Sequence, residues 1–132
     1  MGGSVIQLTD CNIAAIDTTA DAVLVRFLPA QVIKSQGVPG VDASTRWTQS
    51  AIMTFNDAEI EGKRPNLPAV VAGGKITVNR LSYVDMIPIP LEAAGFIRLV
   101  MRFGDAELAI SGTAVKLELF GHGRYIEHIP GT

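Results

Sequence analysis

The stretch FIRLVMRF, residues 96–103, decides the fold class because apolar and polar side chains alternate along it. Four apolar side chains would point to one face of a strand: Ile97, Leu99, Met101 and Phe103. Two arginines would point to the other face, beside Val100: Arg98 and Arg102. A period of two predicts a β-strand with one buried face and one wet face.

The residues after this stretch predict a hairpin. Gly104 and Asp105 favour a tight turn, and alternation resumes over residues 106–120. Within that second stretch the apolar phase slips across residues 111–113, where Gly112 stands. A glycine at a phase slip indicates a β-bulge or a bend in a long strand.

Shorter stretches of the same kind occur at residues 22–27, 30–35, 47–55 and 124–129. In the third of them, one face collects apolar side chains: Trp47, Ala51, Met53 and Phe55. Pro29 falls between the first two and would break, bulge or border that strand, because proline donates no ladder hydrogen bond.

The segments between these strands are rich in glycine and proline. Residues 36–45 are expected to form a long exposed loop, and the prolines of residues 85–91 exclude that segment from the centre of a sheet. One helical turn is expected at most, near residues 69–73, with Gly73 as its cap. The sequence therefore predicts one all-β domain over residues 1–132, an antiparallel sandwich or flattened barrel of about seven to nine strands.

Composition excludes several function classes. The chain has 132 residues, 48% of them hydrophobic, and a net charge of −2, which is typical of an ordered globular domain. Lysine and arginine are scattered, so neither nucleic acid nor a membrane is an expected partner. No nucleotide-binding glycine motif occurs, and a single cysteine allows no internal disulfide and no zinc-binding cysteine pair. We therefore expect no cofactor and no metal, and, without a signal-peptide pattern, a cytoplasmic location.

The tail FGHGRYIEHIPGT, residues 120–132, contains both histidines among other polar side chains. On a regular strand His122, Arg124, Ile126 and His128 would share one face, with Tyr125 and Glu127 on the other. The two histidines would then lie about 20 Å apart at roughly 3.3 Å per residue. We interpret the tail as a last strand with a polar face. The alternative is a small enzyme, or a metal- or anion-binding protein, in which His122 or His128 is the base, Glu127 orients it and Arg124 holds an anion.

The single cysteine, Cys11, lies between Asp10 and Asn12 and invites interpretation as a nucleophile. A catalytic thiol needs a histidine or a helix N-terminus to lower its pKa. We interpret Cys11 instead as a small buried apolar residue.

The long loops carry apolar residues that loops do not require. Trp47 follows the first loop, and Tyr83, Met86 and Ile87 lie at the second. These four residues are the predicted lining of a groove or a subunit interface. We expect a non-catalytic binding or interaction module that self-associates, with a dimer favoured, and whose partner is a small apolar ligand or another protein. A neutralising partner of a second protein, such as an antitoxin or immunity protein, is a further alternative.

Four segments carry a resemblance to known proteins. They are GVPGVDASTRWTQSA, EGKRPNLPA, SYVDMIPIPLEAAG and KLELFGHGRYIEHIP, in this order along the chain. Over about residues 22–129 the sequence resembles a set of short bacterial proteins of unknown function, a kind common in mobile gene cassettes. The resemblance implies no activity, cofactor or catalytic residue.

Overall fold

The computed structural model describes residues 3–35 and 43–130, which fold into β-strands without a helix. The strands are β1 (Gly3–Gln7), β2 (Asn12–Thr18), β3 (Ala22–Ser35), β4 (Ser44–Asn56), β5 (Glu59–Gly62), β6 (Ala69–Val70), β7 (Gly73–Val78), β8 (Leu81–Val84), β9 (Met86–Ile89), β10 (Glu92–Phe103) and β11 (Ala106–Ile129). The prediction of an all-β fold is confirmed.

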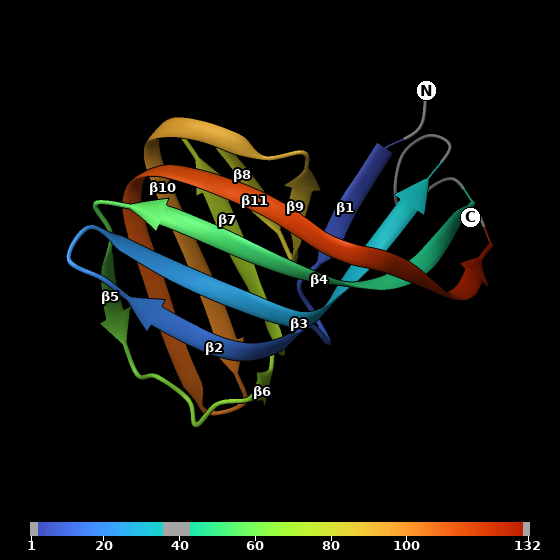
Figure 1. The fold of residues 1–132 in the computed structure, drawn as a ribbon, viewed down its shortest axis with the longest axis horizontal. Helices are drawn as coiled ribbons and strands as arrows, with labels where there is room; N and C mark the ends of the chain where they lie inside the picture. The colour runs from blue at the N-terminus through green and yellow to red at the C-terminus, as the bar shows by residue number, and fades with distance from the viewer. Residues whose placement is uncertain (1–2, 36–42, 131–132) are drawn as a thin grey trace.

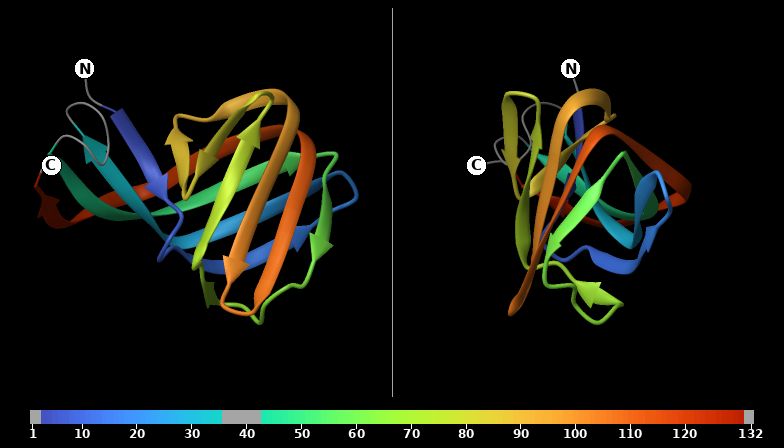
Figure 2. Two further views of the ribbon diagram at one scale, coloured as in Figure 1. Left: turned by 180° about the vertical axis from the view of Figure 1, so that it is seen from behind. Right: turned by 90° about the vertical axis from the view of Figure 1, so that its left-hand side faces the viewer.

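The strands form one curled antiparallel sheet (Figure 1). Eight strands follow each other in the order β6-β2-β3-β4-β11-β10-β7-β8, while β1, β5 and β9 attach beside this path. Seen from the side, the sheet curls around its core as a half-barrel (Figure 2). The architecture is thus an opened barrel rather than two stacked sheets, with β6 at one end of the path and β8 at the other.

Three long strands extend the sheet beyond the curled part: β3, β4 and β11 (Figure 1). On one edge of β3 the first half pairs with β2 and the second half with β1, and β1 in turn pairs with β9. The register of β3 against β4 shifts between Phe27 and Ala30, so the chain passes Pro29 in a bulge. This bulge separates the curled part from the extension.

The predicted hairpin of residues 96–120 is present. β10 and β11 pair antiparallel up to Phe103 and Ala106, and Gly104 turns with a φ of 62°. One edge of β11 pairs with β10, and the strand on its opposite edge changes at Gly112. Residues 108–111 pair there with β5, and residues from 114 onward pair with β4. The phase slip in the sequence therefore corresponds to a change of strand partner.

The concave side of the sheet holds the core, and the alternation in the sequence decides which side chains enter it. Ile97, Leu99, Met101 and Phe103 are all buried, as predicted. The same holds for Ala51, Met53 and Phe55 on β4, with Trp47 partly buried against the core.

Two local expectations are corrected. The segment expected to form a helical turn near residues 69–73 contains the two-residue strand β6, which pairs with β2, and Gly73 opens β7 instead of capping a helix. The tail is not a separate strand, since residues 124–129 are the end of the 24-residue β11.

Other expectations concern the loops. Residues 36–42 of the expected long loop lie outside the described residues, whereas Ser44 already belongs to β4. The proline-containing β9 pairs with β1 alone, as an edge position requires. Among the described residues no helix is long and apolar enough to cross a membrane.

Candidate functional site

A groove of about 500 Å³ lies on the extension of the sheet. Its apolar wall consists of Val5, Ile33, Val84, Met86 and Ile129. Its polar lining consists of Gln7, Thr9, Ser44, Arg46 and Asp85. Volumes of this size are typical of pockets for small molecules.

Strand register explains why these side chains meet on one face. Residues opposite each other on paired strands point to the same side of a sheet. Val5 pairs with Ile33, and Ile33 pairs with Arg46. Further along the same face Gln7 pairs with Met86, and Ser44 pairs with Ile129. The groove therefore spans β9, β1, β3, β4 and the end of β11, which come from distant parts of the sequence.

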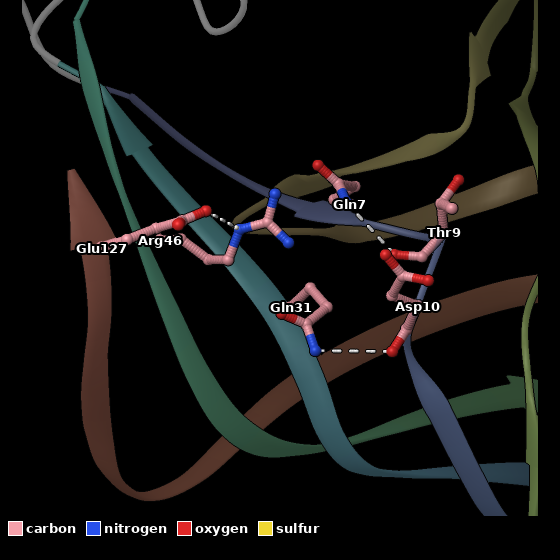
Figure 3. A network of polar contacts seen from close by, with 6 residues as sticks. All are labelled: Gln7, Thr9, Asp10, Gln31, Arg46 and Glu127. Atoms are coloured by element: carbon pink, nitrogen blue, oxygen red, sulfur yellow. Dashed lines mark hydrogen bonds and ion pairs between the residues drawn. The ribbon is translucent and has the colours of Figure 1, made fainter. Parts of the chain in front are cut away.

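Arg46 supplies the positive charge of the groove. Its side chain is 24% exposed, and its Nε atom, which is fully buried, lies 3.3 Å from Oε1 of Glu127 across the β4–β11 pair. This contact is an ion pair, and Nε donates no hydrogen bond to any described residue. Figure 3 shows the two Nη nitrogens on the side away from Glu127, towards Gln7 on β1. Most of the donors of this guanidinium thus face the groove.

The floor near β1 is fixed by polar contacts with backbone. The Gln7 side-chain amide donates to the carbonyl of Thr9 at 3.2 Å, and that of Gln31 donates to the carbonyl of Asp10 at 3.4 Å (Figure 3). Asp85 holds the corner between β8 and β9. One of its carboxylate oxygens accepts a 2.9 Å hydrogen bond from the Gly74 amide, and its carbonyl accepts one from the Leu8 amide.

The structure brings one of the four predicted apolar site residues to the groove, namely Met86. Ile87, its neighbour, is fully buried in the core, and Tyr83 pairs with the buried Ile76 and packs against the core. Trp47 lies on the other face of β4 from Arg46, because the two are adjacent along the strand.

Trp47 is held by its own set of contacts. Its Nε1 donates to Thr45 Oγ1 at 2.8 Å, Lys34 Nζ lies 4.2 Å above its ring centroid, and the Tyr125 ring stands edge-on at 5.4 Å. Trp47 therefore lies on the same stretch of β4 as the groove but on the opposite face, and its predicted role stays a prediction. Arg46 next to Trp47 was the available signal, since strict alternation places it opposite an inward-facing tryptophan.

The tail residues do not converge on one site. Register shifts occur between Phe120 and Arg124 and again between Tyr125 and Glu127. The second shift adds one residue, so the alternation reverses there. The predicted faces are therefore wrong: Arg124 pairs with Thr48 and Glu127 with Arg46 on one face, whereas His128 pairs with Thr45 on the face of Tyr125.

The surroundings of the tail explain its polar composition. His122 lies within the first register shift and is exposed, as are Arg124, Glu127 and His128. No cluster of metal-ligating side chains occurs in the part of the chain that the structure describes. Beyond residue 117 only one edge of β11 is paired with a described strand, namely β4. Bulges and charges on such an edge prevent pairing with other chains.

Cys11 is a buried structural residue. Its Sγ donates to the carbonyl of Gln7 at 3.0 Å and accepts from the Gln31 amide at 3.3 Å. Burial raises the pKa of the thiol to about 12, with a small further rise from Asp10, against the lowering by the Gln31 hydrogen bond. A thiol that stays protonated at neutral pH is a poor nucleophile, so this geometry gives no support to a catalytic role.

Comparisons with protein-family models, with curated proteins and with solved structures find no match for this chain. The resemblance to short bacterial proteins of unknown function stays a prediction. The groove on the sheet extension is the candidate site, and its residues alone carry the functional argument.

Proposed function

We propose that the protein is a non-catalytic binding module that holds a small apolar molecule in the groove of the sheet extension. The observation that carries this proposal is the groove itself, a hollow of about 500 Å³ with five apolar side chains along its wall. Small-molecule pockets usually combine an apolar wall with polar side chains that fix the orientation of the ligand, and here five of the ten lining residues are polar. The edge strand β9 and the corner at Asp85 form one side of it.

The alternative of a small enzyme, or of a metal- or anion-binding protein using the tail, has less support. General acid–base chemistry needs a base, an orienting group and a substrate site within hydrogen-bond reach of one another. Glu127 and His128 lie on opposite faces of β11, and Glu127 is engaged by Arg46. This arrangement favours binding without chemistry.

The proposal is tested with N-phenyl-1-naphthylamine, a neutral apolar dye that fluoresces when it leaves water. We expect saturable binding to the wild type, and a dissociation constant at least about tenfold higher for Met86→Trp, a loss of about 1.4 kcal/mol of binding free energy. The larger indole would fill the hollow beside Val84 and Asp85. The measurement is a fluorescence titration with circular dichroism as the folding check.

The matched control is Phe120→Ala. Phe120 lines a second, smaller apolar hollow of about 330 Å³ on the outside of β3, β4 and β11. This variant should bind the dye like the wild type. Equal affinity of wild type and Met86→Trp, or loss of binding in Phe120→Ala alone, would contradict the groove as the binding site.

We also propose that the protein forms a dimer through antiparallel pairing of β8 with β8 of a second copy. β8 ends the strand path, and among the described strands it pairs with β7 alone. Its sequence, LSYV, has no charge and no proline, and Leu81 and Val84 are 62% and 64% exposed. β8 is short, at four residues, but its edge carries neither charge nor bulge to block pairing with another chain, in contrast to the edge of β11.

Native mass spectrometry at micromolar concentration tests the dimer. We expect a dimer for the wild type and a monomer for Leu81→Lys, because a charge on the edge blocks strand addition. Leu28→Lys is the control: Leu28 is similarly exposed, at 56%, but lies on β3. A monomeric wild type, or equal dissociation by both variants, would exclude pairing through β8.

A further inference from the structure

Arg46 is the cation among the lining residues of the groove. A guanidinium carries five N–H donors in one plane. Within the described residues its one ion-pair partner is Glu127, which approaches Nε from the rim of the sheet. Nε is buried and unsatisfied, and the Nη nitrogens face the hollow between β4 and β1 (Figure 3). Glu127 meets the guanidinium at Nε only, so the four Nη–H donors remain for a second acceptor inside the groove.

We propose that the ligand of the groove is a small amphipathic acid, with its carboxylate or sulfonate on the Nη atoms of Arg46 and its apolar body along Val5, Ile33 and Met86. This inference rests on the proposed function and specifies the ligand class. Arg46 is then the residue that determines specificity. A planar guanidinium matches a carboxylate or sulfonate through two parallel hydrogen bonds.

The neighbouring charges leave this position open for an anion. The Asp85 carboxylate at the far wall accepts a hydrogen bond from the Gly74 amide, so it faces β7 rather than Arg46. Glu127 is 55% exposed, and an exposed partner of this kind contributes little binding free energy. A ligand anion inside the groove would meet the Nη nitrogens, with which Glu127 makes no ion pair.

The apolar part of the groove supports the same orientation. Val5 and Ile33 form a cross-strand pair directly beside the Ile33–Arg46 pair, so apolar surface begins where the guanidinium ends. Gln7 and Met86 form the next pair toward the corner of β8 and β9. A molecule with one charged end and one apolar end matches this sequence of side chains.

The experiment compares two dyes with the same aromatic body. 8-Anilinonaphthalene-1-sulfonate carries a sulfonate, and N-phenyl-1-naphthylamine lacks it. We expect the wild type to bind the sulfonate at least about tenfold more tightly than the neutral dye, the order expected for one charge-assisted hydrogen-bonded contact. In Arg46→Met, which keeps the apolar length of the side chain, this preference should disappear while the neutral dye still binds.

Three further variants secure the interpretation. Arg46→Lys keeps the charge and should retain part of the sulfonate preference. This variant still tests the inference if Arg46→Met fails to fold. Glu127→Gln removes the competing carboxylate and should leave sulfonate binding equal or tighter. Lys34→Met removes the cation that lies over Trp47 on the opposite face, and it should leave the preference unchanged.

Decanoate should displace the sulfonate dye at least about tenfold better than decanamide.

The outcomes separate this inference from the proposed function. If the neutral dye binds in a Met86-dependent manner and Arg46→Met keeps the sulfonate preference, the groove binds apolar ligands and the acid inference is overturned. If the neutral dye fails to bind while the sulfonate binds in an Arg46-dependent manner, the acid inference holds and the apolar-ligand function fails. If neither dye binds, both are overturned. If Lys34→Met alone abolishes the sulfonate preference, the acid inference is overturned.

Discussion

Replacing Phe55 by alanine should lower the free energy of unfolding by about 3–5 kcal/mol, the range found for buried phenylalanines that leave a cavity. Phe55 lies near the C-terminal end of β4 with no exposed surface, between Val23 on β3 and Val115 on β11 in the strand register. All three residues point into the concave side of the sheet, where the strands on both sides hold their spacing. The surrounding sheet can therefore collapse only partly around the missing ring.

The measurement is equilibrium unfolding in urea, followed by tryptophan fluorescence of Trp47 and by circular dichroism. Phe120→Ala is the matched control, because the same side chain is deleted from a position that is 45% exposed on β11. That change should alter stability by no more than about 0.5 kcal/mol. Equal losses in the two variants would mean that the concave side of the sheet is not the core.

Much of this core could be predicted from the sequence because a period of two is a local property. The stretch at residues 96–103 predicted its four buried side chains correctly, and the turn at Gly104 followed from residue type alone. The slip at Gly112 was also visible in the sequence. The sequence did not show that this slip is a change of partner from β5 to β4, because pairing depends on strands far away in the chain.

The groove could not be predicted for the same reason. Alternation assigns Arg46 and Ile33 to faces of their own strands. Their neighbours Val5 and Met86 come from β1 and β9, and alternation does not predict that β1 pairs with β3 and β9 with β1. In the tail, the inserted residue between Tyr125 and Glu127 reverses the faces, and no glycine or proline marks it. When no glycine or proline marks a bulge, periodicity assigns the residues beyond it to the wrong face of the strand.

The glycine pair after residues 69–72 shows how a local signal can have two physical explanations. Two glycines after a short apolar run are compatible with a helix cap, which requires freedom of the backbone. They are equally compatible with the close approach of another chain segment, which requires the absence of a Cβ. The structure shows the second: Gly74 is buried on β7 and pairs with Met101 on β10.

Gly74→Ala should therefore lower the free energy of unfolding by about 3 kcal/mol, at the upper end of the usual overpacking range. A Cβ at this position would overlap the carbonyl oxygen of Val100, which is backbone and cannot rotate away. Relief requires β7 and β10 to separate. It would also strain the hydrogen bonds that Gly74 makes with Asp85 in both directions, its amide to the carboxylate and its carbonyl to the Asp85 amide.

Because Asp85 forms the corner of the groove, the same variant should weaken binding of N-phenyl-1-naphthylamine as well as stability. Gly3→Ala is the control, since a Cβ added on β1 at Gly3 meets no atom within 4 Å and should change stability by no more than about 0.5 kcal/mol. Urea unfolding of both variants, with dye titration of the folded forms, measures the two effects together. A Gly74→Ala protein within about 1 kcal/mol of the wild type would show that β7 and β10 can move apart at little cost. The corner at Asp85 would then be adaptable, and the groove would owe its shape to β1 and β3 rather than to β7.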